Sequence, residues 1–187
     1  MTHLNPLDLM SSLRLTGMAN RHQSIMEMPV HQQPEAGIIL AQLVEAEFLY
    51  RNNRRMLSAI KNAKFRYQAS LNDVVCSDQR NLSRDTLATM ADCSFIERGE
   101  NIIITGATGC GKSYLASAIG YQACMKGKKV AYFSLPKLLG KLKSDRLDSS
   151  FRKEMDRIEN KNLLILDDWG LTPLDTAARL ALLQIIE

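Results

Sequence analysis

Residues 106–113 read Gly-Ala-Thr-Gly-Cys-Gly-Lys-Ser, a complete match to the pattern G-x-x-x-x-G-K-[ST]. Glycines let the backbone turn so tightly that successive N–H groups converge on one anion, and the positive end of the following helix dipole adds to the attraction. The match lies between a β-branched run at 102–104 and a helical pattern at 113–125, the context that a phosphate-binding loop requires. The stretch therefore predicts a P-loop nucleotide-binding fold.

From residue 101 onward, short apolar runs alternate with helical patterns. Strands are expected at 102–104, 130–133 and 163–166, and helices at 113–125, from about Ser134, at 148–159 and at 174–186. Strands that are separated by helical crossovers pair in parallel. The pattern predicts an α/β fold with a three-layer core and a parallel sheet.

The residues before 101 have the patterns of helices. Asn5-Pro6 can cap a short helix that Gly17 is placed to stop, and a long amphipathic helix is expected from about Glu35. Residues 67–72 read as a linker, and Ser83 can cap a helix that runs through Cys93. We therefore expect a helical N-terminal region at 1–68 and a partial P-loop ATPase domain at 69–187.

Two acidic residues follow the apolar run at 163–166. Asp167 is expected where a buried strand emerges beside the loop, and there it would hold Mg²⁺ together with the Ser113 hydroxyl. Asp168 is the candidate for polarising the attacking water, and the alternative is an aspartate that only caps the loop. Lys112 is expected to reach the β and γ phosphates.

The identity of the nucleotide follows from motifs that the sequence lacks. No N-K-x-D guanine-reading motif occurs, because Asn160-Lys161-Asn162 is followed by Leu163. The L-S-G-G-Q signature of transporter ATPases is missing too. ATP is therefore the expected nucleotide.

The net charge of +4 is concentrated in two stretches. Residues 51–66 carry six basic side chains and no acid, and residues 126–146 carry seven against Asp145 alone. Such local bias suits a polyanion, because each neutralised phosphate releases condensed counterions. Duplex DNA is the expected partner, and the alternative is two solvated helix faces.

Composition limits the class of protein further. With 187 residues, 45% hydrophobic and 24% charged, the chain has the balance of a globular domain. No apolar run approaches the roughly 20 residues that span a bilayer, and the first residues lack the features of a signal peptide. We expect a cytoplasmic protein without a membrane partner.

Four segments together resemble the IstB-like ATP-binding proteins, which are AAA+ helpers of insertion-sequence transposition and relatives of DnaC-type helicase loaders. The segments are 43–47, 61–64, 106–113 and 163–171, and the likeness runs from Leu13 to the end of the chain. The resemblance implies an AAA+ core, with a helical front that supports DNA binding and self-assembly. It further implies that ATP drives assembly on DNA and that the assembly, a homo-oligomer, engages the transposase of the same element.

The resemblance also assigns roles to residues. Asp167 and Ser113 would contact magnesium, Asp168 would activate water, and Lys112 would act in catalysis as well as in binding. Phosphate contacts would come from Gly106, Ala107, Thr108, Gly109, Cys110, Gly111, Lys112 and Ser113.

One departure from the family lies at the end of the chain. An AAA+ core has two further strands, a polar sensor and arginine fingers after the acidic pair, and none can be assigned here. The expectation is a C-terminally truncated copy that binds nucleotide but hydrolyses it slowly, because a missing arginine finger costs about 10³–10⁵ in rate.

Three other functions stay open at this point. A DnaC-like helicase loader in DNA replication is the near relative, and a non-hydrolysing, nucleotide-gated DNA-binding scaffold belongs to a different class. A small-molecule kinase is weaker, since no acceptor-binding lid is evident.

Overall fold

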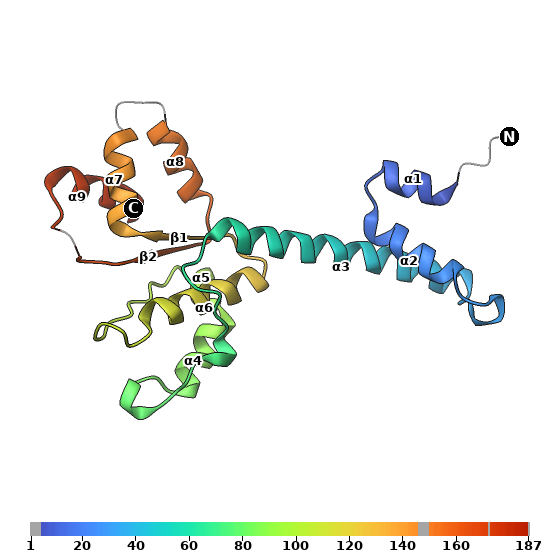
Figure 1. Cartoon of the computed structure of the whole chain (residues 1–187), viewed down its shortest axis with the longest axis horizontal. Helices are drawn as coiled ribbons and strands as arrows, with labels where there is room; N and C mark the ends of the chain where they lie inside the picture. Colours follow the sequence, from blue (N-terminus) through green and yellow to red (C-terminus); the bar gives the residue numbers. More distant parts are fainter. Residues whose placement is uncertain (1–4, 146–149, 172, 187) are drawn as a thin grey trace. The chain divides into compact units, whose positions relative to one another are not determined.

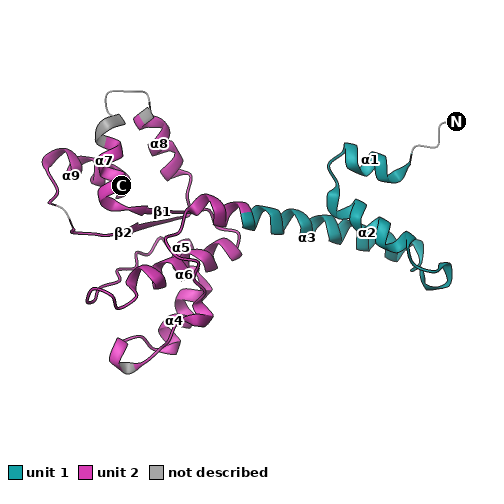
Figure 2. Cartoon of the chain, viewed as in Figure 1, with its two compact units in different colours: residues 1–57 teal, residues 58–187 magenta. Residues whose placement is uncertain are grey.

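The computed structural model describes residues 5–145, 150–171 and 173–186, and the side chains in these ranges except those at 78, 143–145 and 150. The chain divides into two compact units, residues 1–57 and 58–187, and the boundary lies within the long helix α3 (Ala36–Ala63) (Figure 2). The division at 68/69 stays a prediction. None of the described helices is both long enough and apolar enough to cross a membrane.

In unit 1 a first short helix contacts a second one, and the second packs on the first part of α3. As predicted, Asn5 caps α1 (Pro6–Ser12), and its Oδ1 accepts a hydrogen bond of 3.1 Å from the Leu7 N–H. Arg14, in the left-handed conformation with φ 57°, then turns the chain into α2 (Thr16–Met26). A 3₁₀ turn, η1 (Val30–Gln32), leads to α3.

The prediction that Gly17 stops the first helix is wrong. Gly17 lies inside α2 and is buried against α3, where an added Cβ would lie 2.5 Å from the Ala46 carbonyl oxygen and 2.8 Å from the Glu47 Cα. Its role is close helix packing, because only a hydrogen at Cα leaves room for the facing backbone. A sequence pattern cannot distinguish this role from that of a helix stop.

A carboxylate from α3 caps the beginning of α2. Glu47 is 7% exposed, and its Oε2 accepts a hydrogen bond of 3.1 Å from the Met18 N–H, while its Oε1 lies 2.7 Å from the Arg51 Nε. Burial by itself raises the pKa of Glu47, but these hydrogen bonds outweigh it and hold the pKa below the usual value. The ionised carboxylate thus satisfies an N–H of α2 that has no partner within its own helix.

Unit 2 has a parallel sheet between two layers of helices (Figure 1). Strand β1 (Val130–Ser134) pairs with β2 (Leu163–Asp167) in a register that sets Val130 opposite Leu163 and Ser134 opposite Asp167. Helix α6 (Lys112–Met125) packs on one face, and α7 (Leu135–Asp145), α8 (Ser150–Glu159) and α9 (Thr176–Ile186) cover the other. The predicted three-layer α/β fold with a parallel sheet is confirmed, and the start of the helix predicted at 148 lies outside the described residues.

The two faces of the sheet contribute to separate hydrophobic clusters. Val130 and Ile165 pack with α6, whereas Phe133 and Leu164 pack with α7 to α9. This division follows from the alternation of side chains along a strand. It also places the side chains of Tyr132 and Asp167 on the α6 side, where the loop at 106–113 lies.

The strand predicted at 102–104 does not form. No backbone hydrogen bond joins residues 101–105 to another segment of the described chain. Ile104 still packs against the cluster around α6, but Ile103 is 85% exposed. A β-branched run becomes a strand only when a neighbour supplies ladder hydrogen bonds, and here β2 pairs with β1.

A smaller helical layer precedes the loop. As predicted, Ser83 caps a helix, α4 (Arg84–Asp92), and its Oγ accepts a hydrogen bond of 3.0 Å from the Thr86 N–H. Residues 67–72, expected as a linker, include Ala69 and Leu71, which are buried in the core. The elements of this layer are η2 (Leu71–Asp73), η3 (Asp78–Arg80), α4 (Arg84–Asp92) and α5 (Ser94–Glu97).

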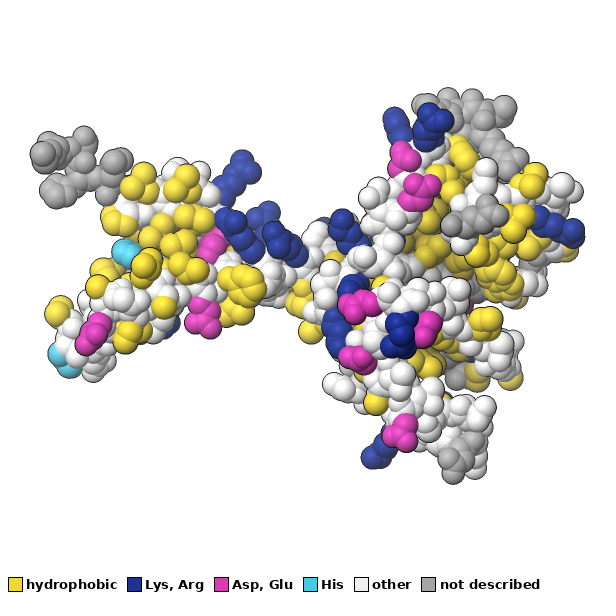
Figure 3. All heavy atoms as spheres, turned by 180° about the vertical axis from the view of Figure 1, so that it is seen from behind, with side chains coloured by type: hydrophobic (Ala, Val, Ile, Leu, Met, Phe, Trp, Pro, Cys, Tyr) yellow, Lys and Arg dark blue, Asp and Glu magenta, His cyan; other side chains and the backbone are white. Residues whose placement is uncertain are grey.

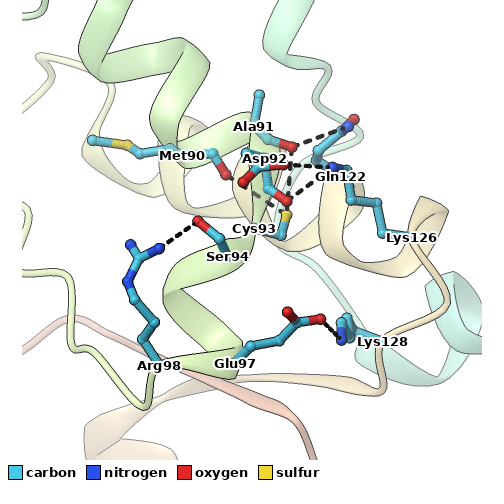
Figure 4. A network of polar contacts seen from close by, with 10 residues as sticks. All are labelled: Met90, Ala91, Asp92, Cys93, Ser94, Glu97, Arg98, Gln122, Lys126 and Lys128. Atoms are coloured by element: carbon cyan, nitrogen blue, oxygen red, sulfur yellow. Dashed lines mark hydrogen bonds and ion pairs between the residues drawn. The ribbon is translucent and has the colours of Figure 1, made fainter.

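A polar network ties this layer to the end of α6 (Figure 4). Lys126 Nζ donates to the Asp92 carbonyl oxygen at 2.8 Å and lies 3.3 Å from Asp92 Oδ1. Lys128 Nζ lies 2.9 Å from Glu97 Oε1. Two cations of the stretch at 126–146 therefore have partners within the protein.

Candidate nucleotide-binding site

The loop at 106–113 has the backbone geometry that its glycines predict. Gly106, Gly109 and Gly111 take φ angles of 151°, 82° and 94°, a region that residues with a Cβ rarely adopt. Gly111 is the N-cap residue of α6. The loop thus ends at the N-terminus of a 14-residue helix, whose free N–H groups favour an anion.

Lys112 lies across this loop. Its Nζ donates hydrogen bonds to the carbonyl oxygens of Gly106 at 2.9 Å and Ala107 at 2.8 Å. The ammonium group is therefore held beside the main chain of the loop, with its charge uncompensated by a carboxylate among the described residues. A phosphate bound by the loop would supply that compensation.

The acidic pair lies at the end of β2. Asp167 is the last residue of the strand, and Asp168 follows with φ 61°. Aspartate tolerates this left-handed conformation better than most residues. The tight turn directs the two consecutive carboxylates into one region, instead of to opposite faces as in a strand.

Two residues that the sequence did not suggest complete the acidic site. The Tyr132 hydroxyl donates a hydrogen bond to Asp167 Oδ2. Arg66 Nη1 lies 3.3 Å from Asp167 Oδ2 and 3.2 Å from Asp168 Oδ1. Strand register could have suggested Tyr132, but Arg66 lies in the basic stretch at 51–66, and no local signal links it to carboxylates 101 and 102 positions away.

The surroundings of Asp167 favour its ionised form. Burial raises the pKa of this carboxyl, but hydrogen bonds from Tyr132, Ser113, the Asp168 backbone and Arg66 outweigh burial and hold the pKa below its usual range. Burial also raises the pKa of Tyr132, and the neighbouring Asp167 raises it further. At neutral pH the pair is therefore a phenol that donates and a carboxylate that accepts.

One cavity of about 680 Å³ brings most of the predicted residues together. Its walls include the acidic pair at 167–168 and the only tryptophan, Trp169. Ala107 and Cys110 are not among its lining residues. The loop residues that line it are Gly106, Thr108, Gly109, Gly111, Lys112 and Ser113.

The donors in this cavity fit magnesium. The Ser113 hydroxyl and the Asp167 carboxylate are oxygen ligands, which Mg²⁺ prefers, and the ion usually keeps further positions for water and phosphate. The acidic pair already attracts a cation, the Arg66 guanidinium. When bound, the metal would neutralise charge on the phosphates.

Some residues of the two basic stretches have acidic partners in the structure, and others line a second cavity. Arg51 pairs with Glu47 at 2.7 Å, and Lys126 and Lys128 pair with the acids described above. Arg146 and the side chain of Lys143 lie outside the part of the chain that the structure describes. Other members meet in unit 2 at a second cavity of about 800 Å³, beside the acidic pair. Its cationic residues are Lys64, Arg66, Lys137 and Lys141 from the two stretches, together with Arg157 and Lys161 from outside them.

Comparison with known proteins agrees with this geometry. Residues 8–187 match the family model described as IstB-like ATP binding protein. The chain is 34% identical over 181 residues to the insertion sequence ATP-binding protein y4pL of Sinorhizobium fredii, covering 97% of this chain and 74% of that protein. It is also 34% identical to the ATP-binding protein of insertion sequence IS1162 from Pseudomonas fluorescens, covering 97% of this chain and 79% of the relative.

A more distant relative extends the comparison. The ATP-binding protein of insertion sequence IS21 from Pseudomonas aeruginosa is 26% identical over 167 residues, which are 89% of this chain and 63% of the relative. The family match includes the loop at 106–113 and the acidic pair that lines the same cavity. The chain belongs to the family of IstB-like ATP-binding proteins.

Proposed function

We propose that the protein is an ATP-dependent helper of DNA transposition, which assembles on duplex DNA with ATP and Mg²⁺ and engages the transposase of its insertion sequence. The observation that carries the proposal is the meeting of Lys112, Ser113 and Asp167 in one cavity. Relatives that are named as insertion sequence ATP-binding proteins support the biological context.

In this proposal each residue has a defined task. The amides at 106–113 and the Lys112 ammonium bind and orient the phosphates, while Ser113 and Asp167 would hold the metal. Asp168 would accept a hydrogen bond from the attacking water and take its proton. Its carboxylate is one methylene shorter than the glutamate common in related ATPases, so its turn geometry with φ 61° determines how far it reaches.

Cys110 provides a direct test of nucleotide binding. Its side chain is exposed on the loop, whereas Cys93 and Cys124 are buried, and burial raises the pKa of Cys124 to about 11. We expect iodoacetamide to modify Cys110 faster than either buried thiol, and ATP with Mg²⁺ to slow modification of Cys110 by about tenfold or more, since roughly 90% occupancy leaves a tenth of the loops open. Peptide mapping by mass spectrometry after timed alkylation measures both rates.

The contrast between cysteines supplies the control. Cys76 is partly exposed and, unlike Cys110, is not part of the loop at 106–113 that would contact the phosphates. Its rate of alkylation should be the same with and without nucleotide. Equal modification of Cys110 in the presence and absence of saturating ATP would contradict phosphate binding by the loop.

DNA contact is proposed at the second cavity. Of its cations, Lys64, Lys137 and Lys161 have no ion-pair partner in the part of the chain that the structure describes. Lys141 and Arg157, by contrast, share Glu154 at 2.7 Å and 3.9 Å. Lysines without an acidic partner are free to neutralise backbone phosphates.

This proposal predicts a change in salt dependence. The double variant Lys137→Gln/Lys161→Gln should weaken duplex DNA binding with ATP and lower the slope of log affinity against log salt by roughly two, one for each lost phosphate contact. Fluorescence anisotropy of a labelled duplex at several salt concentrations measures the slope. Lys126→Gln/Lys128→Gln is the matched control, because these lysines already have acidic partners.

The same samples distinguish the remaining functions. Phosphate release that DNA stimulates supports a hydrolysing helper, whereas ATP-dependent retention on DNA without release supports the scaffold alternative. Pull-down with the transposase or with a replicative helicase separates a transposition helper from a helicase loader. An unchanged salt slope in the Lys137/Lys161 variant would contradict the proposed DNA site.

Self-assembly is proposed through unit 1. Figure 3 shows hydrophobic side chains gathered on the surface of this unit. Leu40, Val44 and Phe48 follow one another at intervals of four on α3, and each is more than half exposed. Exposed apolar surface of this kind supports contact with another copy of the chain.

A further inference from the structure

The segment after α3 is anchored in unit 2 by two aromatic residues. Lys64 takes φ 58° and ends the helix. Phe65 packs over Gly120, and its Cε1 would lie 2.5 Å from a Cβ added to that glycine. The centres of the Phe65 and Tyr132 rings are 6.3 Å apart, and the ring planes are inclined at 77°. Tyr67 lies 6.2 Å from the Tyr114 ring.

Arg66 is held between these anchors. Its guanidinium lies 5.8 Å from the centre of the Tyr67 ring, and one nitrogen, Nη1, contacts both Asp167 and Asp168. Arg66 Nη1 contacts the Oδ2 atom of Asp167, and the same atom also accepts a hydrogen bond from the Tyr132 hydroxyl. A cation from outside the P-loop and its helix is thus placed on the two carboxylates assigned to metal and water.

We propose that Arg66 is an internal cation for the acidic pair, and that a divalent metal arriving with nucleotide must replace it. This inference rests on the proposed function and concerns the regulation of the same site. Arg66 and the metal compete, because both cations require Asp167 and their charges repel each other at this distance. The exchange is feasible because the Arg66 side chain is 49% exposed, and ion pairs of this exposure are weak.

The charge of Arg66 has opposite effects on the site without metal and on the site with metal. Without metal, its charge offsets the two carboxylates and so reduces their repulsion of the nucleotide phosphates. With metal, the same charge opposes the ion that should occupy the acidic pair. Removing the charge should therefore weaken ATP binding in the absence of metal. It should also lower the Mg²⁺ concentration that is needed to occupy the acidic pair.

The test measures both quantities in Arg66→Gln. ATP affinity in EDTA should fall roughly three- to fivefold, and the Mg²⁺ concentration that gives half of the metal-dependent change should fall by a similar factor, as expected for loss of one exposed ion pair. Titration calorimetry gives the affinity in EDTA. The fluorescence of Trp169, the only tryptophan, follows the metal because this residue lines the same cavity.

Three further measurements keep the outcomes distinct. Arg66→Lys retains the charge and should restore both values toward those of the wild type, and Arg80→Gln, which removes a cation bonded to the Val75 carbonyl, should change neither. Thermal unfolding of each variant reports whether it is folded. A fall in the ATP affinity together with a rise in the Mg²⁺ concentration needed, a gain in the ATP affinity, or no shift in folded Arg66→Gln would overturn the inference. Failure of the wild type to bind ATP would overturn the proposed function instead.

Discussion

Replacing Lys112 with alanine is expected to abolish ATP binding, with an affinity loss of at least about 100-fold. The wild-type ammonium lies 2.9 Å from the Gly106 oxygen and 2.8 Å from the Ala107 oxygen, beside the amides that would hold the phosphates. Hydrogen bonds to charged groups contribute about 1.5–3 kcal/mol each, so the loss of two phosphate contacts accounts for this factor. Alanine also removes the two bonds that join the side chain to the loop.

The measurement is a calorimetric titration with ATP in the presence of Mg²⁺. Lys129→Ala is the control, because Lys129 is an exposed lysine that lines neither cavity. Its affinity should equal that of the wild type. Equal ATP affinity in Lys112→Ala and the wild type would contradict the assignment of the loop, and the proposed transposition function would lose its support.

Gly17→Ala is expected to destabilise unit 1 by about 1–3 kcal/mol, the usual cost of an extra methyl in a tightly packed contact. The added Cβ would lie 2.5 Å from the Ala46 oxygen, 2.8 Å from the Glu47 Cα and 2.8 Å from the Tyr50 Cβ. Two of these atoms belong to backbone, so relief requires α2 and α3 to move apart. That movement also lengthens the bond from the Met18 N–H to the Glu47 carboxylate.

Native-state hydrogen exchange of the α2 amides measures this loss directly, because it reports local opening. Gly37→Ala is a matched control in α3, where an added Cβ meets nothing within 4 Å. That substitution should leave the exchange of the α2 amides unchanged or slightly slower, since alanine is at least as favourable as glycine in a helix. The same exchange rates in Gly17→Ala and the wild type would show that α2 and α3 do not pack so closely.

Local patterns predicted several elements correctly because the interactions that form them are local. The Asn5 cap, the Ser83 cap and the strand at 130–134 each depend on residues within a few positions or on one buried run. The backbone of the loop at 106–113 belongs to the same class, since its glycines and the helix that follows are contiguous. For these features the chain needs no distant partner to adopt the predicted backbone.

Distant contacts explain what the sequence did not predict. The run at 102–104 has strand propensity but no ladder partner, and Gly17 has the appearance of a helix stop although it serves as a packing residue. Lys126 and Lys128 count as basic charge in the sequence, yet each pairs with an acid more than 30 positions away. Their partners come from α4 and α5, which the pattern did not place beside the end of α6.

The amino-acid sequence alone was sufficient to predict the glycine-rich turn at 106–113, the α/β class and the family, because each depends on a contiguous motif or on the order of elements. Only the tertiary structure decided that Arg66 and Tyr132 meet Asp167, and that Glu47 caps α2. The physical reason is that ion pairs and hydrogen bonds between distant residues depend on strand register and helix packing. Those arrangements follow from burial of the whole core and are not encoded in any single segment.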